Sequence, residues 1–177
     1  ADDPPTPRAE PVPVPKALLH HDDGDSVWIR WPTGVEVVRI LGMDTPETAH
    51  PEHDIPYAQP FGEAAAGFLR GCVAMADRVE LLRAEEKDPY GRTLAYLLLD
   101  GRNYSVLVVE ARLAAENVRH FGDNGFPDRA AAVLAAAKAA GPVPFEPPHR
   151  FRSRMRKVSA WLREQGEYPG EEETDDR

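Results

Sequence analysis

The sequence has little cysteine, no long apolar run and a shortage of positive charge. Its single cysteine, Cys72, excludes a disulfide within the 177 residues. No stretch approaches the roughly 20 consecutive apolar residues of a membrane-spanning helix. The formal net charge of -9 argues against nonspecific electrostatic binding of nucleic acid. What remains, 42% hydrophobic and 29% charged residues, is ordinary for one globular domain with tails.

Proline and charge divide the chain into three predicted parts. Residues 1–15 hold six prolines and little to bury, which predicts a disordered arm. Residues 16–142 are predicted to form the folded domain. Residues 143–177 combine a proline-rich spacer, a basic segment over 150–157 and an acidic tail.

Hydrophobic periodicity in the central part predicts a mainly β domain with about three helices. The predicted strands cover 17–21, 27–31, 35–41, 79–84 and 94–99, and the predicted helices cover 61–76, 104–109 and 127–140. Segment 104–109 also has the valines of a strand, although we favour a helix. One or two further helical turns are predicted over 158–162. This order is the outline of a five-stranded Greek-key barrel of the oligonucleotide-binding (OB) type, an α+β fold dominated by β.

The segment from Arg39 to Glu47 ends an apolar strand in opposed charges. Arg39, Asp44 and Glu47 flank the bend that Pro46 fixes. A buried strand end of this kind is either a costly ion pair or a site prepared for a charged ligand. Two further turns, at residues 23–26 and 88–92, add acids and an arginine, which favours the site.

Asp25 and Asp44 are the predicted metal ligands. Calcium prefers oxygen donors, and two carboxylates brought together from different strands would repel each other unless a cation lay between them. Thr45 could add its backbone carbonyl. The Asp-Gly-Asp tripeptide that contains Asp25 is also common as a plain turn, so this prediction depends on the neighbouring motifs.

Arg39 and Arg92 are the predicted phosphate clamp, because a guanidinium matches two phosphate oxygens and keeps its charge. Glu47 could orient or deprotonate a water molecule. The alternatives are a structural ion pair for Arg39, a solvated turn for Arg92 and a surface position for Glu47. Tyr90 could reach a phosphate with its hydroxyl. The histidines show no zinc-binding spacing.

Taken in order, Asp-Gly-Asp-Ser, Arg-x-x-x-x-Asp-Thr-Pro-Glu and Asp-x-Tyr-Gly-Arg closely resemble motifs of the staphylococcal nuclease (thermonuclease) family. The resemblance runs from about residue 16 to about residue 140. It implies an OB barrel and a calcium-dependent, sugar-nonspecific nuclease. Such a hydrolase acts on DNA and RNA, here preferably single-stranded, and leaves 3′-phosphates.

The resemblance also implies a role for each matching residue. Asp25, Asp44 and the Thr45 carbonyl would bind calcium, Arg39 and Arg92 would hold the phosphate, Glu47 would act on the attacking water, and Tyr90 and His120 would contact the substrate. The family has two tyrosines where this chain offers Val118 and His120, and often a lysine at Pro89. These departures predict weaker substrate binding with the chemistry intact.

The basic segment over 150–157 lies outside the resemblance. It could contact phosphates, although a solvated tail is the simpler interpretation.

The leading hypothesis from the resemblance is a monomeric nuclease, secreted or associated with the cell envelope and without a membrane span. The alternatives are a catalytically weak nucleic-acid-binding OB module and an acidic scaffold protein.

Overall fold

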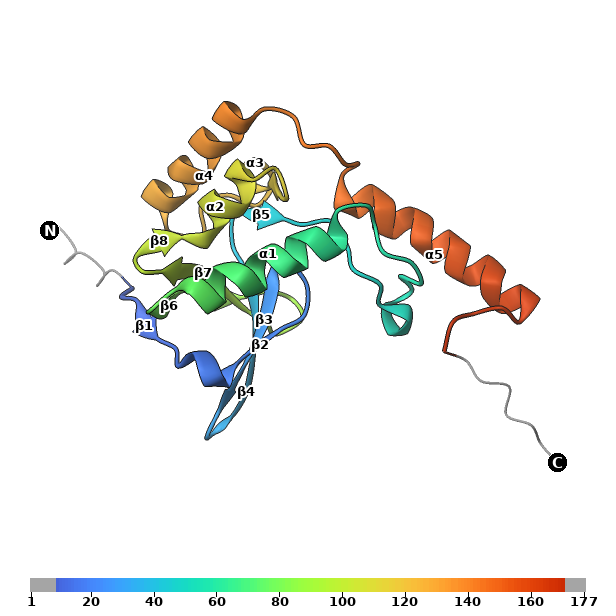
Figure 1. Cartoon of the computed structure of the whole chain (residues 1–177), viewed down its shortest axis with the longest axis horizontal. Helices are drawn as coiled ribbons and strands as arrows, with labels where there is room; N and C mark the ends of the chain where they lie inside the picture. Colours follow the sequence, from blue (N-terminus) through green and yellow to red (C-terminus); the bar gives the residue numbers. More distant parts are fainter. Residues whose placement is uncertain (1–8, 171–177) are drawn as a thin grey trace, which may run out of the picture.

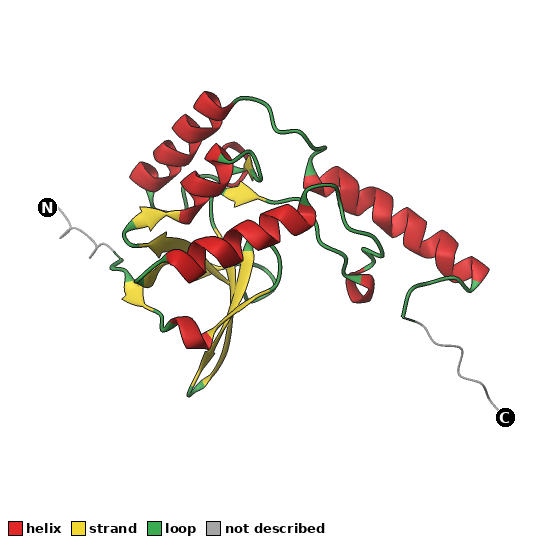
Figure 2. Ribbon diagram, viewed as in Figure 1, coloured by secondary structure: helices red, strands yellow, loops and turns green. Residues whose placement is uncertain are grey.

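The computed structural model describes residues 9–170, so most of the predicted acidic tail and the first eight residues of the predicted arm lie outside the described part. The strands are β1 (Val12–Pro13), β2 (Leu19–His21), β3 (Ser26–Trp31), β4 (Gly34–Ile40), β5 (Met43–Asp44), β6 (Val79–Lys87), β7 (Thr93–Leu99), β8 (Arg102–Asn103) and β9 (Ala115–Glu116). The α-helices are α1 (Gly62–Met75), α2 (Tyr104–Glu110), α3 (Val118–Phe121), α4 (Pro127–Ala140) and α5 (Pro148–Gln165). Short 3-10 turns cover Lys16–Leu18 and Pro51–His53 (Figures 1 and 2).

The main sheet curls into an OB-like half-barrel. Its strand order is β1-β6-β7-β4-β3-β2, with β8 added to β7. The pairs are antiparallel except β4 and β7, which run parallel. β1 and β2 stand at opposite ends of this order although only residues 14–18 separate them, so the two ends of the sheet must lie close together. The predicted α+β class dominated by β is confirmed.

Alternation along β3 and β4 explains why the sheet has a buried face. Val27 and Ile29 are fully buried, while Trp28 between them is 38% exposed. Val27 pairs with Val38 on β4, which is also fully buried. Such a period of two places both side chains of every second cross-strand pair in the core, and those of the pairs between them on the other face.

Helices α1 and α2 lie against the main sheet and contact each other, and α4 packs on α2 (Figure 1). α1 buries Ala65, Leu69 and Val73 at helical spacing. The ambiguous segment is the helix α2, as favoured: Asn103 caps it by accepting a hydrogen bond from the Ser105 amide at 3.0 Å. Five α-helices are present in the described residues: the three predicted ones, α3, which was not predicted, and α5, of which only one or two turns were predicted.

The predicted disordered arm is wrong for its last residues. Val12 and Pro13 pair with β6, and the Val14 amide donates to the Val79 carbonyl at 2.8 Å. Val14 is only 4% exposed. Proline is tolerated in this strand because β1 is terminal in the strand order and pairs on one side only.

The largest difference from the sequence-based prediction is α5. We expected a spacer followed by one or two helical turns at 158–162, whereas an 18-residue helix begins at Pro148. Proline suits the first helical position because its missing N–H has no intrahelical partner there. Phe151 and Met155 pack with Ile55 in a small core separate from the main one.

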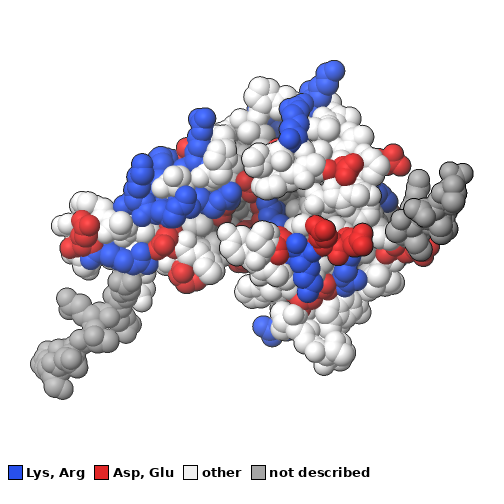
Figure 3. Space-filling model, turned by 180° about the vertical axis from the view of Figure 1, so that it is seen from behind, with Lys and Arg blue, Asp and Glu red and all other residues white. Residues whose placement is uncertain are grey.

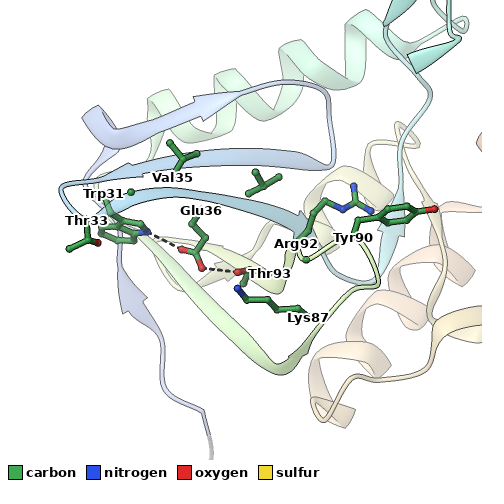
Figure 4. Close-up of a pocket in the computed structure, with 11 residues that line it drawn as sticks. Trp31, Thr33, Val35, Glu36, Lys87, Tyr90, Arg92 and Thr93 are labelled. Atoms are coloured by element: carbon green, nitrogen blue, oxygen red, sulfur yellow. Dashed lines mark hydrogen bonds between the residues drawn. The ribbon is translucent and has the colours of Figure 1, made fainter. Parts of the chain in front are cut away.

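Glu36 joins four strands of the barrel through a hydrogen-bond network. It accepts from the Trp31 indole at 2.9 Å and the Thr93 hydroxyl at 2.8 Å (Figure 4). It also accepts from the Arg83 guanidinium at 2.7 and 2.9 Å. The Arg83 hydrogen bonds contribute most to lowering the pKa of Glu36, from 4.5 to about 2. The network therefore stabilises the ionised carboxylate in the folded state.

The Glu36 network should make stability depend on acid pH. Because the pKa is lower in the folded protein, the stabilisation is complete above about pH 4.5 and is lost as the pH falls toward 2. Glu36→Gln should lower the free energy of unfolding by about 1–3 kcal/mol at pH 7. Urea unfolding should show this difference shrinking below pH 4.5. The exposed Glu85→Gln serves as control, and a difference independent of pH would contradict the assignment.

Candidate active site

A cavity of about 680 Å³ brings together the three predicted motifs. Its lining includes Asp25, Arg39, Asp44, Glu47, Tyr90 and Arg92. The acids and arginines therefore share one concave surface, although they come from segments far apart in the chain. Thr45 and His120 are the predicted site residues that do not line this cavity.

Arg39 is held in place by the end of β4. Its guanidinium lies 3.2 Å from a carboxylate oxygen of Asp25 and 3.2 Å from one of Asp44. It also donates to the backbone carbonyls of Asp25, Ile40 and Met43. The ion pair considered for Arg39 is thus present, and it links the two predicted metal ligands.

The Asp-Gly-Asp turn packs directly on Thr45. The Thr45 amide donates to Asp25 at 3.0 Å, and both residues are buried. A Cβ on Gly24 would lie 2.8 Å from the methyl group of Thr45, so this close approach needs glycine. The turn is therefore part of the site rather than an isolated surface turn.

Asp23 is a site residue that our sequence reasoning missed. It lines the cavity, and its carboxylate accepts a hydrogen bond from the Asp25 amide at 3.1 Å. The signal was available, because Asp23 is the other acid of the Asp-Gly-Asp tripeptide.

Burial and mutual repulsion shift the pKa values of the clustered aspartates. Burial, followed by the charge of Asp25, raises the pKa of Asp23 well above its usual range and also raises the pKa of Asp44. Burial would likewise raise the pKa of Asp25, but Arg39 and hydrogen bonds outweigh it, so that pKa is lowered. A bound cation would relieve this repulsion.

The donor set fits a hard divalent cation. Asp23, Asp25 and Asp44 offer carboxylate oxygens, and calcium and magnesium prefer oxygen ligands. The hydroxyl of Thr45 is buried without a hydrogen-bond partner among the described residues. Asp23 also belongs to a group with Asp22 and His50, whose potential ligand atoms all lie within 4.8 Å of one another.

The backbone of Glu47 is buried beside the acid cluster and is held by hydrogen bonds with Gln59. Its amide donates to the Gln59 side chain at 3.2 Å, and its carbonyl accepts from the Gln59 amide at 2.8 Å. Burial raises the pKa of Glu47, and the charge of Arg152 opposes this shift. A buried carboxylate with a raised pKa is suited to accept a proton near neutral pH.

Arg152, from α5, is a second site residue that our sequence reasoning missed. It forms ion pairs with Glu47 and, at 3.6 Å, with Asp44. Figure 3 shows Lys and Arg side chains gathered over the part of the molecule that α5 forms. The sequence marked this segment as basic, but only the folded chain brings one of its arginines into the cavity.

The turn at 88–92 presents Arg92 and Tyr90, as expected. Asp88 accepts hydrogen bonds from the Arg92 amide at 2.8 Å and the Arg92 guanidinium at 2.6 Å. The Tyr90 ring is 85% exposed and lies 5.8 Å from the Arg92 guanidinium carbon. Both also line a smaller hollow of about 410 Å³ (Figure 4). The carboxylate in that hollow, Glu36, is already bonded by its own network, so the larger cavity is the candidate site.

The far wall of the cavity differs from the expected arrangement. His120 lies exposed on α3 and contacts Phe121 at 4.5 Å between ring centroids, whereas Phe121 and Asn117 line the cavity. Val118 is buried. Because α3 is a helical turn rather than a strand, residues two apart do not share a face.

The fold and the site together define a class: an OB-like barrel with an acidic cluster and arginines in one cavity. Residues 37–141 match the family described as Staphylococcal nuclease homologue. The chain belongs to this family. The matched residues include Arg39, Asp44, Glu47 and Arg92, but neither Asp25 nor α5.

Individual relatives agree with this assignment. A thermonuclease from Staphylococcus intermedius is 40% identical over 93 residues, which cover 52% of this chain and 53% of that protein. The SPbeta prophage-derived endonuclease YokF of Bacillus subtilis (strain 168) is 33% identical over 93 residues, 52% of this chain and 30% of that protein. Endonuclease YncB of the same strain is 32% identical over 93 residues and is covered to 43%. The match therefore spans about half or less of each relative.

None of the helices in the described part of the chain is long and apolar enough to cross a membrane.

Proposed function

We propose that the protein is a calcium-dependent nuclease that hydrolyses DNA, RNA or both and leaves 3′-phosphate ends. The observation that carries this proposal is the meeting of Asp25, Asp44, Arg39, Glu47 and Arg92 around one cavity. A protein that only binds nucleic acid has no need to gather carboxylates where a phosphate must enter.

Asp25 and Asp44 would hold the metal with the Thr45 carbonyl, and Asp23 would add negative charge beside them. When bound, a divalent cation would polarise a phosphate oxygen and stabilise the charge that develops on it. Calcium is our choice because the donors are all oxygens and because the motifs resemble those of the thermonuclease family.

Glu47 would take the proton of the attacking water. The water oxygen then forms a bond to phosphorus, and the bond from phosphorus to the 5′ oxygen breaks in line with it. The 5′ oxygen takes up a proton from solvent, which leaves a 3′-phosphate and a 5′-hydroxyl. Arg39 and Arg92 would stabilise the added negative charge, since a planar guanidinium matches two phosphate oxygens.

Tyr90 and Phe121 are the groups best placed to contact bases. Both rings are largely exposed at the cavity lining. Unstacked bases can stack on such rings without regard to sequence, which favours a single-stranded substrate. We further propose a monomer that acts outside the cytoplasm or at the cell envelope, and we place His120 beside the substrate only through its contact with Phe121.

Metal titration tests the proposal directly. The protein should hydrolyse a single-stranded oligonucleotide in calcium, less or not at all in magnesium, and not with excess chelator. End analysis of the products should find 3′-phosphates. Asp25→Asn should remove the calcium response, whereas Asp128→Asn, on the exposed start of α4, should not. Full hydrolysis in chelator would contradict the proposal, and binding without hydrolysis in any metal would favour the OB binding module.

A further inference from the structure

Helix α5 is fixed beside the cavity by contacts with the loop over 48–60. Besides the Ile55 core, the Ser159 hydroxyl donates to the Asp54 carbonyl at 3.0 Å, and the Tyr168 hydroxyl donates to the Pro51 carbonyl at 2.5 Å. Gln59 donates to the Glu146 carbonyl at 2.8 Å. The buried Gln59 side chain also accepts a hydrogen bond from the Glu47 amide. It therefore connects the Glu47 backbone with the segment that precedes α5.

α5 is strongly basic in a chain that is acidic overall. It contains Arg150, Arg152, Arg154, Arg156, Lys157 and Arg163 but only one acid, Glu164. Most of these cations are exposed. Arg152 is the one that reaches the carboxylates of the cavity.

The three arginines that line the cavity differ in how they are held. Arg39 donates to three backbone carbonyls besides its two aspartates, and Arg92 is held by Asp88 in its own turn. The hydrogen bonds and ion pairs found for Arg152 in the described structure are with Asp44 and Glu47 alone. Its side chain is 35% exposed, against 16% for Arg39. Arg152 can therefore exchange partners without breaking the fold.

We propose that Arg152 is a third phosphate-binding arginine of the active site, supplied by α5 from outside the family domain. In the free protein its guanidinium lies against Glu47 and Asp44. When nucleic acid enters, the guanidinium transfers to a phosphate oxygen, which leaves Glu47 free to accept a proton. This inference rests on the proposed function and deepens it.

Charge supports the transfer of Arg152 to the substrate. A phosphate entering the cavity meets the carboxylates of Asp23, Asp25, Asp44 and Glu47, so a third cation beside Arg39 and Arg92 would lower the repulsion that it meets. The partners of Arg152, Asp44 and Glu47, are anions of the site, and no backbone carbonyl holds its guanidinium in the described structure, so a phosphate can replace one of them. The planar guanidinium can then bind two phosphate oxygens at once.

Three variants of the full chain test the assignment. Arg152→Ala removes the guanidinium, and Arg152→Lys keeps the charge without the planar fork. Arg150→Ala is the matched control, because Arg150 is exposed on the same helix and lies about 200° around it from Arg152. Each is assayed for kcat and KM on a single strand of about 12 nucleotides in calcium. Each is also assayed for binding of a phosphorothioate strand of the same length, which keeps its charge and resists hydrolysis, and for the melting temperature.

Arg152→Ala should lose about tenfold or more in kcat/KM and bind the phosphorothioate strand about tenfold more weakly. Arg152→Lys should recover part of both, and Arg150→Ala should stay within about twofold of the parent protein. Increased activity in Arg152→Ala would identify Arg152 as an inhibitory contact and overturn the proposal. A lowered melting temperature with unchanged strand binding would identify a structural ion pair and also overturn it.

The two proposals can fail separately. Absence of hydrolysis in any metal, combined with binding that depends on Arg152, would reject the nuclease function but support the phosphate contact. Hydrolysis and binding that are indifferent to Arg152 would reject the phosphate contact alone.

Discussion

Replacing Glu47 by glutamine should lower kcat by about 10²–10⁴-fold while leaving the fold intact. Glutamine has nearly the same shape and keeps the backbone bonds to Gln59, but its amide cannot accept a proton from water. Initial rates on a single-stranded oligonucleotide in saturating calcium measure the loss. Binding of the phosphorothioate strand should change much less than kcat.

Glu63→Gln is the matched control for Glu47→Gln. Glu63 lies exposed in the first turn of α1, close to Glu47 in sequence but not among the residues that line the cavity. The same loss of one carboxylate should leave its kcat near that of the parent protein. If Glu47→Gln retained full activity, Glu47 would have no role in proton transfer.

Replacing Gly62 by alanine should damage both stability and activity. A Cβ at Gly62 would overlap the Glu47 carbonyl oxygen and lie 2.7 Å from the carbonyl carbon. These are backbone atoms and cannot rotate aside, so the start of α1 or the Glu47 segment must move. We expect about 1–3 kcal/mol less stability. We also expect about 10²-fold lower activity, because misplacement by about 1 Å has that effect.

Gly71→Ala, in the same helix, separates this clash from a general effect of glycine replacement. A Cβ there meets nothing within 4 Å. Alanine should therefore raise the free energy of unfolding by about 0.5–1 kcal/mol, since glycine is a poor residue for a helix interior. Urea unfolding and initial rates on both variants provide the comparison. Equal effects at the two glycines would show that Gly62 does not hold Glu47 in place.

Local patterns predicted most of the barrel, because its strands and α1 bury residues at regular intervals. α4 was predicted with its observed bounds, since Pro127 begins it and Gly141 follows it. α5 was underestimated because the partner of its sparse apolar face, Ile55, is distant in sequence. Its basic composition and flanking prolines resembled those of a solvated tail.

The site residues that could be predicted are those in short motifs whose residue types indicate metal or phosphate binding. Asp25, Asp44 and Arg39 do meet, as the motifs suggested, and their individual roles remain predictions. Arg152 could not be predicted, because no local pattern distinguishes it from the other arginines of α5. Its importance comes only from the docking of that helix.

The pairing of β1 with β6 covers one edge of the main sheet. β1 covers β6, and Pro11, Pro13 and Pro15 lack the N–H groups with which a strand of another molecule would pair. Loss of this short segment would uncover the backbone of β6 and create a template for intermolecular β-pairing. Residues far from the proposed chemistry thus cover a sheet edge to which another chain could otherwise pair.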